Sequence, residues 1–474
     1  ASTAAGGDQL NRGRAAPTMS RAAALFREGK LDEARALAED IVRAESRHFY
    51  ALHLLSVIAH QWGEWEEAIG LASRALEVEP HNVEVLCNRG AALRKLHRFE
   101  EALEDYDRAL TISPESHLAL NNRGVALAAL NRHREALQNF DEALRLRPGY
   151  AQAHNSRAVS RLTLGELAAG WDDYEWRWSG SDQPTPMRQI DVPMFTDDDW
   201  GRCRVALWTE QGVGDQLLFS TLVPELEARG QDFALEVDER LAPAFRRAHP
   251  TWTVVPRGPS MAGFAGCDRH LPIGSLPRLL RRTQESFHRQ PKALLAADPV
   301  RTNQFRSGFG FTAQVVGIAW RSFQPKLRVY YEGRKNAPLA VFRDLSRSLR
   351  IRLLDLQYGD TASERAVFAR NGGELSRIED LDLFTDLDGL LAAIAACDVV
   401  VSTSNVTAHL AGCLGKRTFL MVLEGNPAFH YWVPDARGHS PWYPSVEIVT
   451  DPAMDSWEKA LQVVAGRLAA TPAG

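Results

Sequence analysis

Two stretches decide the fold of the N-terminal part: VEVLCNRGAALRKLHRFEEALEDYDRALTIS at residues 83–113 and HLALNNRGVALAALNRHREALQNFDEALRLR at residues 117–147. Each has the pattern of two helices and is followed by a turn that contains proline. Equivalent residues recur 34 positions apart, namely Pro80, Pro114 and Pro148, and the Asn-Arg-Gly triplets at 88–90 and 122–124. A helix pair of this kind covers its apolar face only when the next pair stacks on it, so the sequence predicts a stack of repeats.

A period of 34 residues is typical of the tetratricopeptide (TPR) repeat. We expect a TPR superhelix over residues 18–180 with a concave groove for an extended segment of another protein, built from hairpins at 18–46, 49–79, 83–113 and 117–147. Asn88 and Asn122 hold the position which, in repeats resembling the O-GlcNAc transferase superhelix, hydrogen-bonds the backbone of a bound peptide. The alternative is that both asparagines cap or solvate the helix surface.

A fifth repeat begins at Ala151 and changes in character. Its sequence GWDDYEWRW at residues 170–178 keeps the helical register but adds three tryptophans, and Tyr174 stands where earlier repeats have Tyr106 and Phe140. Aromatic side chains bury a large area, and a terminal repeat needs a cover. We therefore expect this segment to dock the superhelix onto the next domain.

Composition narrows the class of protein. The chain has 474 residues, 45% hydrophobic and 24% charged, with a net charge of −5, which gives no general attraction to nucleic acid. The five cysteines form no CxxC pair, and we interpret them as reduced residues of a cytoplasmic protein. Residues 1–17 lack a continuous apolar core and fit a disordered leader better than a signal peptide. The apolar run 390–401 is short and contains Asp398, so no transmembrane segment is expected.

The second half has the pattern of a different fold. A proline-rich linker is expected at 181–200, followed by short β-branched strands that alternate with helices, as in βαβ units with parallel sheets. Strands are expected at 204–208, 233–237 and 251–255, and then at 315–320, 351–357, 398–402 and 418–423. This arrangement predicts two Rossmann-like lobes, at 201–312 and 313–474, with a final helix near 454–468.

Ligands of open α/β sheets bind outside the carboxyl ends of the strands, so the loops there are the candidates for chemistry. The first loop is Glu210-Gln211-Gly212-Val213-Gly214-Asp215, in which the glycines allow a tight turn and close approach of a substrate. The alternative for Asp215 is a plain helix N-cap. The loop lacks the third glycine and the later acidic residue of a dinucleotide fingerprint, so it predicts no NAD site.

Two further segments are candidates for a phosphate site. After the strand 398–402, Ser402-Thr403-Ser404-Asn405 opens a helix that contains Thr407 and His409, and a helix start offers free backbone N–H groups to an anion. Arg321 and Ser322 follow the strand 315–320, and Lys335 lies in the next basic stretch. The alternatives are a satisfied core histidine at 409 and a solvated cationic loop.

The order of the motifs resembles that of bacterial TPR proteins fused to a glycosyltransferase domain of the heptosyltransferase-like family 9 type. The matching pieces span most of the chain: GWxxYEWRW, EQGxGD, GIAWRS, RKNAPL, LQYGD, NxTAHLAGxLGK and SPWYPS. The resemblance implies an α superhelix followed by a GT-B fold of two Rossmann-like lobes. It also implies an inverting, metal-independent transfer, with the acceptor on the first lobe and a nucleotide-sugar co-substrate on the second.

Family roles carry over only onto matching residues. In heptosyltransferase-like enzymes the Asp of the glycine loop is the general base, which implies Asp215, with Glu210 in reserve and Gln211, Gly212 and Gly214 in the acceptor loop. Donor contacts are implied for Arg321, Ser322, Lys335, Asn405, Thr407 and His409. Many relatives have an aspartate several residues before the histidine, whereas this chain has Ser404-Asn405, so a heptose donor does not follow.

The sequence thus indicates a cytoplasmic glycosyltransferase that modifies a Ser or Thr of a protein held by the repeats. Flagellin is the acceptor suggested by the similar architecture of flagellin-modifying TPR enzymes. One alternative keeps the chemistry but places a lipopolysaccharide or capsule saccharide in the acceptor site. Another makes the chain a TPR adaptor with a degenerate transferase fold.

Overall fold

The chain divides into two compact units, Ala1–Ser160 and Arg161–Gly474. The computed structural model describes residues 5–179, 187–258, 262–309, 314–322, 336–348, 351–423, 430–450 and 455–470. The boundary lies inside the fifth repeat, because the second helix of that repeat packs with the α/β part. The boundary expected near residue 180 therefore falls within the second unit.

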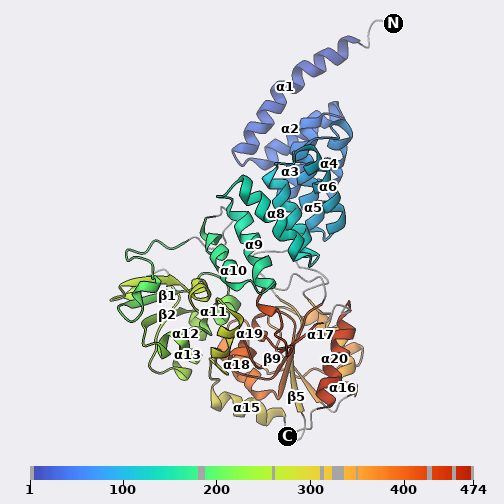
Figure 1. Cartoon of the computed structure of the whole chain (residues 1–474). Helices are drawn as coiled ribbons and strands as arrows, with labels where there is room; N and C mark the ends of the chain where they lie inside the picture. Colours follow the sequence, from blue (N-terminus) through green and yellow to red (C-terminus); the bar gives the residue numbers. More distant parts are fainter. Residues whose placement is uncertain are drawn as a thin grey trace. The chain divides into compact units, whose positions relative to one another are not determined.

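The first unit is a run of helix hairpins, coloured blue to green in Figure 1. Its helices are α1 (Ala5–Arg27), α2 (Leu31–Ala44), α3 (Phe49–Trp62), α4 (Trp65–Val78), α5 (Val83–Lys95), α6 (Phe99–Ile112), α7 (His117–Ala129), α8 (His133–Leu146) and most of α9 (Ala151–Thr163). Each hairpin packs on the next, α4 on α5 and α6 on α7. The predicted hairpins are confirmed.

Small residues let the paired helices approach closely. A Cβ at Gly90 would lie 2.7 Å from the Tyr106 ring, and one at Gly124 would lie 2.5 Å from the Phe140 ring. Both rings are fully buried. In these two repeats the aromatic residue therefore packs onto a glycine of the same repeat.

Helix α1 begins at Ala5, within the segment 1–17 for which we expected disorder. Pro17 lies inside this helix, where it lacks the N–H of one backbone hydrogen bond, so the helix continues through it at a cost. The lack of a continuous apolar core in this segment does not prevent a helix.

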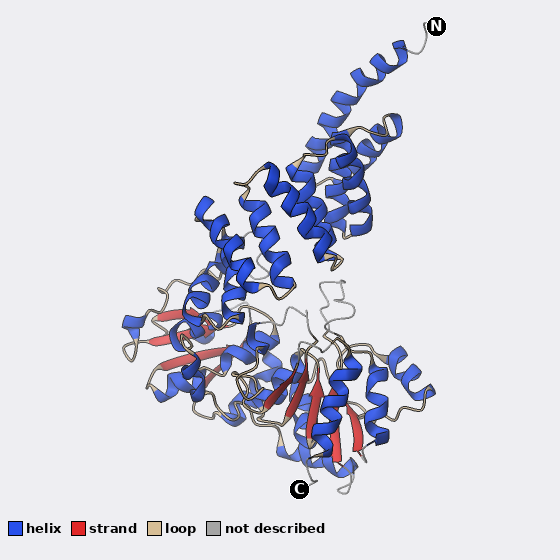
Figure 2. Ribbon diagram, turned by 45° about the vertical axis from the view of Figure 1, so that its right-hand side comes forward, coloured by secondary structure: helices blue, strands red, loops and turns tan. Residues whose placement is uncertain are grey.

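The second unit contains two all-parallel sheets, the two groups of red strands in Figure 2, both flanked by helices. The first sheet has the order β3-β2-β1-β4, from β1 (Arg204–Trp208), β2 (Asp232–Val237), β3 (Thr253–Pro256) and β4 (Arg269–Pro272). Its helices include α11 (Val213–Ser220), α12 (Val223–Ala228), α13 (Ala242–Ala248) and α14 (Leu276–Leu280). The sequence did not predict β4, which has four residues, begins with Arg and ends at Pro.

The second sheet has the order β6-β5-β7-β8-β9, from β5 (Gln314–Ala319), β6 (Ile351–Asp355), β7 (Val399–Ser402), β8 (Thr418–Met421) and β9 (Val446–Val449). Its helices include α15 (Pro299–Phe309), α16 (Arg343–Ser348), α17 (Ala362–Arg370), α18 (Leu387–Ala396), α19 (Val406–Cys413) and α20 (Trp457–Ala469). The four predicted strands and the final helix are present, and β9 is an additional short edge strand.

The two sheets share one hydrophobic core. Helix α11 of the first sheet packs on α19 of the second. Arg247 of α13 also pairs with both carboxylate oxygens of Asp388 in α18, at 3.0 and 2.8 Å. These contacts bring the carboxyl-end loops of the two sheets close to each other.

The described part of the expected linker packs on the first sheet. Met194 forms a parallel bridge with His270 of β4, and the backbone N–H of Phe195 donates to the His270 carbonyl at 2.9 Å. Arg188 pairs with Glu236 of β2 at 2.6 Å. Residues 193–195 thus add a short bridge at the edge of the sheet beside β4, which Pro193 concealed in the sequence.

The end of the fifth repeat also packs in the second unit. Helix α10 (Leu167–Tyr174) and the 3₁₀ turn η1 (Glu175–Trp178) follow α9. Trp171 is buried, and its ring meets Phe219 of α11 and Trp442 edge to face, with centroids 6.4 and 6.1 Å apart. The tryptophan-rich segment therefore supplies core to the α/β part, as its composition predicted.

Candidate functional site

Each sheet has one point where the order of its strands reverses. In the first sheet this point lies between β1 and β4, and in the second it lies between β5 and β7. Open parallel sheets bind ligands outside the carboxyl ends of the strands at such points. The loops after these four strands are therefore the candidate ligand sites.

The protein itself fills the reversal point of the first sheet. Glu210, which follows β1, accepts from Arg177 Nε and Nη2, both at 3.1 Å, and Arg177 also donates to Ser275 Oγ at 2.9 Å. Burial raises the pKa of Glu210, while the Arg177 guanidinium opposes that rise. The Glu210 carboxylate is thus fully engaged, which argues against its role as a reserve base.

The glycine loop is held from several sides. Gln211 Nε2 donates to the Tyr174 hydroxyl at 2.7 Å, and the Gln211 carbonyl accepts from Arg257 at 3.1 Å. Helix α11 begins at Val213 with Gly212 as its N-cap. Asp215 is therefore the third residue of the helix, and the alternative that it is the N-cap is wrong.

The loop after β1 meets the helix after β7. A Cβ at Gly214 would lie 3.1 Å from Cδ2 and 3.2 Å from Nε2 of His409. The Nδ1 atom of His409 is 2.9 Å from the Tyr443 hydroxyl, and the ring lies beside Tyr431 and Trp432. The imidazole is buried and fixed, so Gly214 is the residue that allows this approach.

The charge of Asp215 acts on three buried tyrosines. Burial raises the pKa values of Tyr174, Tyr431 and Tyr443, and the negative charge of Asp215 raises all three further. Two of these rings, Tyr431 and Tyr443, also lie beside His409. The sequence did not single out Tyr431 or Tyr443, although Tyr443 belongs to the SPWYPS motif.

The reversal point of the second sheet brings together residues that the sequence predicted. The Gln357 side chain accepts from the backbone N–H groups of Trp320 and Arg321, at 2.9 and 2.8 Å, and donates to the Arg321 carbonyl at 3.0 Å. Asn405 is the N-cap of α19, and its Nδ2 donates to the same carbonyl at 3.4 Å. The loops after β5, β6 and β7 thus form one network.

The Arg321 side chain is held by its own lobe. Its guanidinium donates to Glu364 Oε1 at 2.6 Å and to the Asp360 carbonyl at 2.5 Å, and Glu364 also accepts from the Trp320 indole. Among the described residues, the buried atoms Arg321 Nε and Thr403 Oγ1 have no hydrogen-bond partner. An anion bound at this point would contact Arg321, whose positive charge is partly balanced by the Glu364 carboxylate.

The other predicted donor residues have different surroundings. Thr407 is completely buried, and its hydroxyl donates to the Leu356 carbonyl at 3.2 Å, so it stabilises the packing of α19. The backbone N–H of Ser322 donates to Asn336 Oδ1 at 2.9 Å. Lys335 lies outside the described residues.

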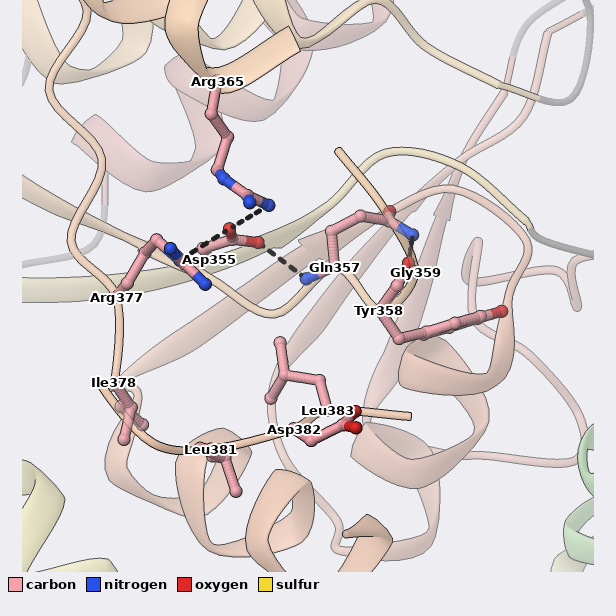
Figure 3. A pocket seen from close by; sticks show the side chains of 10 residues that line it. All are labelled: Asp355, Gln357, Tyr358, Gly359, Arg365, Arg377, Ile378, Leu381, Asp382 and Leu383. Atoms are coloured by element: carbon pink, nitrogen blue, oxygen red, sulfur yellow. Dashed lines mark hydrogen bonds and ion pairs between the residues drawn. The ribbon is translucent and has the colours of Figure 1, made fainter. Parts of the chain in front are cut away.

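A pocket of about 220 Å³ opens at the carboxyl end of β6 (Figure 3). Asp355, at its inner end, accepts from the Gln357 backbone N–H at 2.9 Å and lies 3.6 Å from Arg365 and 3.8 Å from Arg377. Burial raises the pKa of the Asp355 carboxyl. The rest of the lining mixes Tyr358, Ile378, Leu381 and Leu383 with the carboxylate of Asp382.

The predicted groove asparagines lie in the first unit and differ from each other. The Asn88 amide is 3.0 Å from His53 Nε2 of a neighbouring hairpin. Asn122 is partly exposed, and no described residue hydrogen-bonds its side chain. Asn88 is therefore already paired, whereas the Asn122 amide is available to a ligand.

The described part of the chain offers neither a metal cluster nor a membrane-spanning helix. No three or more His, Cys, Asp or Glu side chains there are placed to hold a metal ion together. None of the helices described is both long and apolar enough to cross a membrane.

Comparison with known proteins identifies the repeats. Family models of the tetratricopeptide repeat match residues 19–83, 83–116 and 117–150. The first unit therefore consists of TPR repeats, a fold that binds segments of partner proteins.

One curated relative extends further along the chain. Protein FlbA of Caulobacter vibrioides is 30% identical over 326 residues, which are 65% of this chain and 53% of that protein. The chain thus spans about half the length of this relative.

Solved structures that resemble the chain cover about a third of it. A MamA structure covers 33% of this chain with 15% identity and a TM-score of 0.31. The structure of YrrB, described as a TPR protein with an unusual peptide-binding site, covers 37% with 21% identity and a TM-score of 0.31.

Proposed function

We propose that the chain is a glycosyltransferase of the GT-B class that transfers a sugar from a nucleotide-sugar to a protein hydroxyl. The observation that carries the proposal is the meeting of the glycine loop with α19, where Gly214 lies against His409. Gly214 and His409 belong to the helices that follow β1 and β7, at the carboxyl ends of the two parallel sheets. An acceptor bound to the first sheet and a donor bound to the second would react at this point. Of the two carboxylates of the Glu210–Asp215 loop, Glu210 is buried in an ion pair with Arg177.

The second sheet supports the donor part of the proposal. The start of α19, Arg321 and the pocket at the end of β6 are linked through Gln357, which contacts Arg321 and lines the pocket. A helix start and an arginine suit a diphosphate. The pocket combines the Tyr358 ring and aliphatic side chains with charged groups, and this combination suits a base and the hydroxyls of a ribose.

The reaction follows from these placements. Asp215 takes the proton of the acceptor hydroxyl as its oxygen forms a bond to the anomeric carbon of the sugar. The bond from that carbon to the phosphate oxygen breaks, and the nucleotide leaves with the electron pair. Attack opposite the leaving group inverts the anomeric centre, and the partly balanced charge of Arg321 stabilises the phosphate that departs.

The TPR repeats support a protein acceptor, because they bind segments of partner proteins. We propose a Ser or Thr hydroxyl of a protein held in the groove. Flagellin is the first acceptor to test, on the resemblance to flagellin-modifying TPR enzymes.

A thermal-shift panel tests the proposal with the full chain. UDP, GDP, CDP, CMP and ADP are compared, since a ligand that binds the native state alone raises its melting temperature. We expect one of them to stabilise the chain equally with and without EDTA. The matching nucleotide-sugar should then add one sugar mass to the acceptor. Loss of binding with EDTA would contradict a metal-independent site, and partner binding with neither nucleotide binding nor transfer would identify an adaptor.

A further inference from the structure

The last repeat reaches into the glycine loop. Tyr174, the final residue of α10, accepts a hydrogen bond from Gln211 Nε2 at 2.7 Å. Gln211 stands four residues before Asp215, at the start of the turn that leads into α11. A side chain of the repeat segment is therefore a direct partner of the loop that carries the proposed base.

Repeat packing alone does not require this hydroxyl. Tyr174 occupies the repeat position of Tyr106 and Phe140, each 34 residues from the next. At the earlier positions the aromatic ring packs on a glycine, and Phe140 does so without a hydroxyl. The fifth repeat has Ala158 in place of that glycine, and the Tyr174 hydroxyl contacts Gln211, which lies outside the repeat. The hydroxyl of Tyr174 therefore has a partner that the packing of the repeats does not supply.

The neighbouring residues hold the same loop. Arg177, one helical turn after Tyr174, binds Glu210 through two hydrogen bonds, and its guanidinium lies 4.5 Å from the centroid of the Tyr174 ring. On the other side of the loop, Arg257 donates to the Gln211 carbonyl. Two consecutive loop residues are therefore fixed by the repeat segment, one through an ion pair and one through a hydroxyl.

We infer that Tyr174 is a positioning residue, which sets the conformation of the Gln211–Gly214 turn and thereby the place of Asp215. The inference rests on the proposed function for its effect on transfer, whereas its effect on the turn is independent of that function. The last TPR helix is then part of the catalytic lobe, and the acceptor loop is built jointly by the repeat segment and the first sheet.

The test compares Tyr174→Phe with the matched control Tyr106→Phe, both in the full chain. Hydrogen exchange is measured on peptides that cover residues 209–216, together with melting temperature, nucleotide binding and transfer. We expect faster exchange at 211–214 in Tyr174→Phe alone, with nucleotide binding unchanged. The transfer rate should fall about 10-fold at saturating acceptor, because a misplaced base lowers kcat more than it weakens binding.

A double-variant cycle with Gln211→Leu shows whether Tyr174 acts through Gln211. Tyr174→Phe should have no further effect on exchange or transfer in that background, because coupled residues are not additive. Additive effects, or exchange at 211–214 equal to that of the control, would overturn the inference while leaving the glycosyltransferase proposal intact. A wild-type chain that transfers no sugar would overturn the proposed function, and the exchange comparison would still decide the role of Tyr174.

Discussion

Gly214 lies against the imidazole of His409, so that a Cβ at residue 214 would be 3.1 Å from Cδ2 of the ring. The two residues belong to α11 and α19, the helices that follow β1 and β7. The imidazole cannot easily move away from a group added at residue 214, because it is buried and its Nδ1 atom lies 2.9 Å from the Tyr443 hydroxyl. This contact lies at the candidate site, where the packing of α11 on α19 joins the two sheets.

Gly214→Ala should therefore disturb the site. The added methyl group forces His409 or α11 to move, and overpacking of this kind typically costs about 1–3 kcal/mol. We expect a lower melting temperature and a loss of transfer that exceeds the loss of folded protein. Gly466→Ala in α20 is the matched control, since its Cβ would lie in open space. Equal effects of the two substitutions would show that the contact with His409 is not the cause.

The repeats should lose stability in mild acid. Burial lowers the pKa values of His53, His60, His117 and His133. A histidine whose pKa is lowered on folding contributes stability that is present above its unfolded pKa, near 6.5, and is lost as the pH falls below that value. We expect exchange protection of the first unit to fall between pH 7 and pH 5.

His53 offers a specific check of this pH dependence. Its Nε2 lies 3.0 Å from the Asn88 amide, and protonation of the ring would remove the acceptor of that hydrogen bond. His53→Gln keeps an acceptor without a titrating group, so the variant should lose less protection in acid than the wild type. A pH dependence equal to that of the wild type would assign the acid sensitivity to the other histidines.

The two asparagines that were predicted to contact a peptide in the TPR groove should have different roles. Asn122→Ala should weaken binding of a protein acceptor, because no described residue occupies its amide. Asn88→Ala should mainly destabilise the repeats, because Asn88 is paired with His53. Affinity for the acceptor and melting temperature separate the two effects. Unchanged acceptor affinity in Asn122→Ala would contradict a peptide contact at this position.

The sequence predicted the repeat hairpins closely because a 34-residue period repeats the same packing demand several times. It missed β4 and β9, although it found β7 and β8, which are equally short but almost wholly apolar or β-branched. β4 (RHLP) and β9 (VEIV) each contain a charged residue, and β4 ends at Pro. The sequence alone also could not show that Glu210 is held in an ion pair and that Thr407 donates to a backbone carbonyl. The partners that engage them, Arg177 and the Leu356 carbonyl, lie 33 and 51 residues away, and only the fold brings them together.

Donor binding should depend on Arg321. Arg321→Glu places a negative charge beside the proposed diphosphate and next to Glu364, so we expect the nucleotide-induced rise in melting temperature to disappear. Arg370→Glu is the matched control, an exposed arginine whose side chain bonds only to a backbone carbonyl of its own helix, Ala366 O. Unchanged nucleotide binding in Arg321→Glu would remove this residue from the donor site.

The decisive substitution is Asp215→Asn. A neutral hydroxyl is a weak nucleophile, and a carboxylate that takes its proton contributes about 10²–10⁴ in rate. The amide keeps the size of the side chain but cannot accept the proton. Asp215 lies in the first turn of α11 rather than at its N-cap. Loss of a negative charge from a first turn typically costs about 0.3–1 kcal/mol, so folding should be little affected. We expect near-normal melting temperature and nucleotide binding with transfer reduced by that factor. Asp232→Asn, at an exposed aspartate that begins β2, is the control for loss of a charge in the same unit. Wild-type transfer by a folded Asp215→Asn chain would exclude this residue as the base. The groups around His409 would then be tested as the proton acceptor.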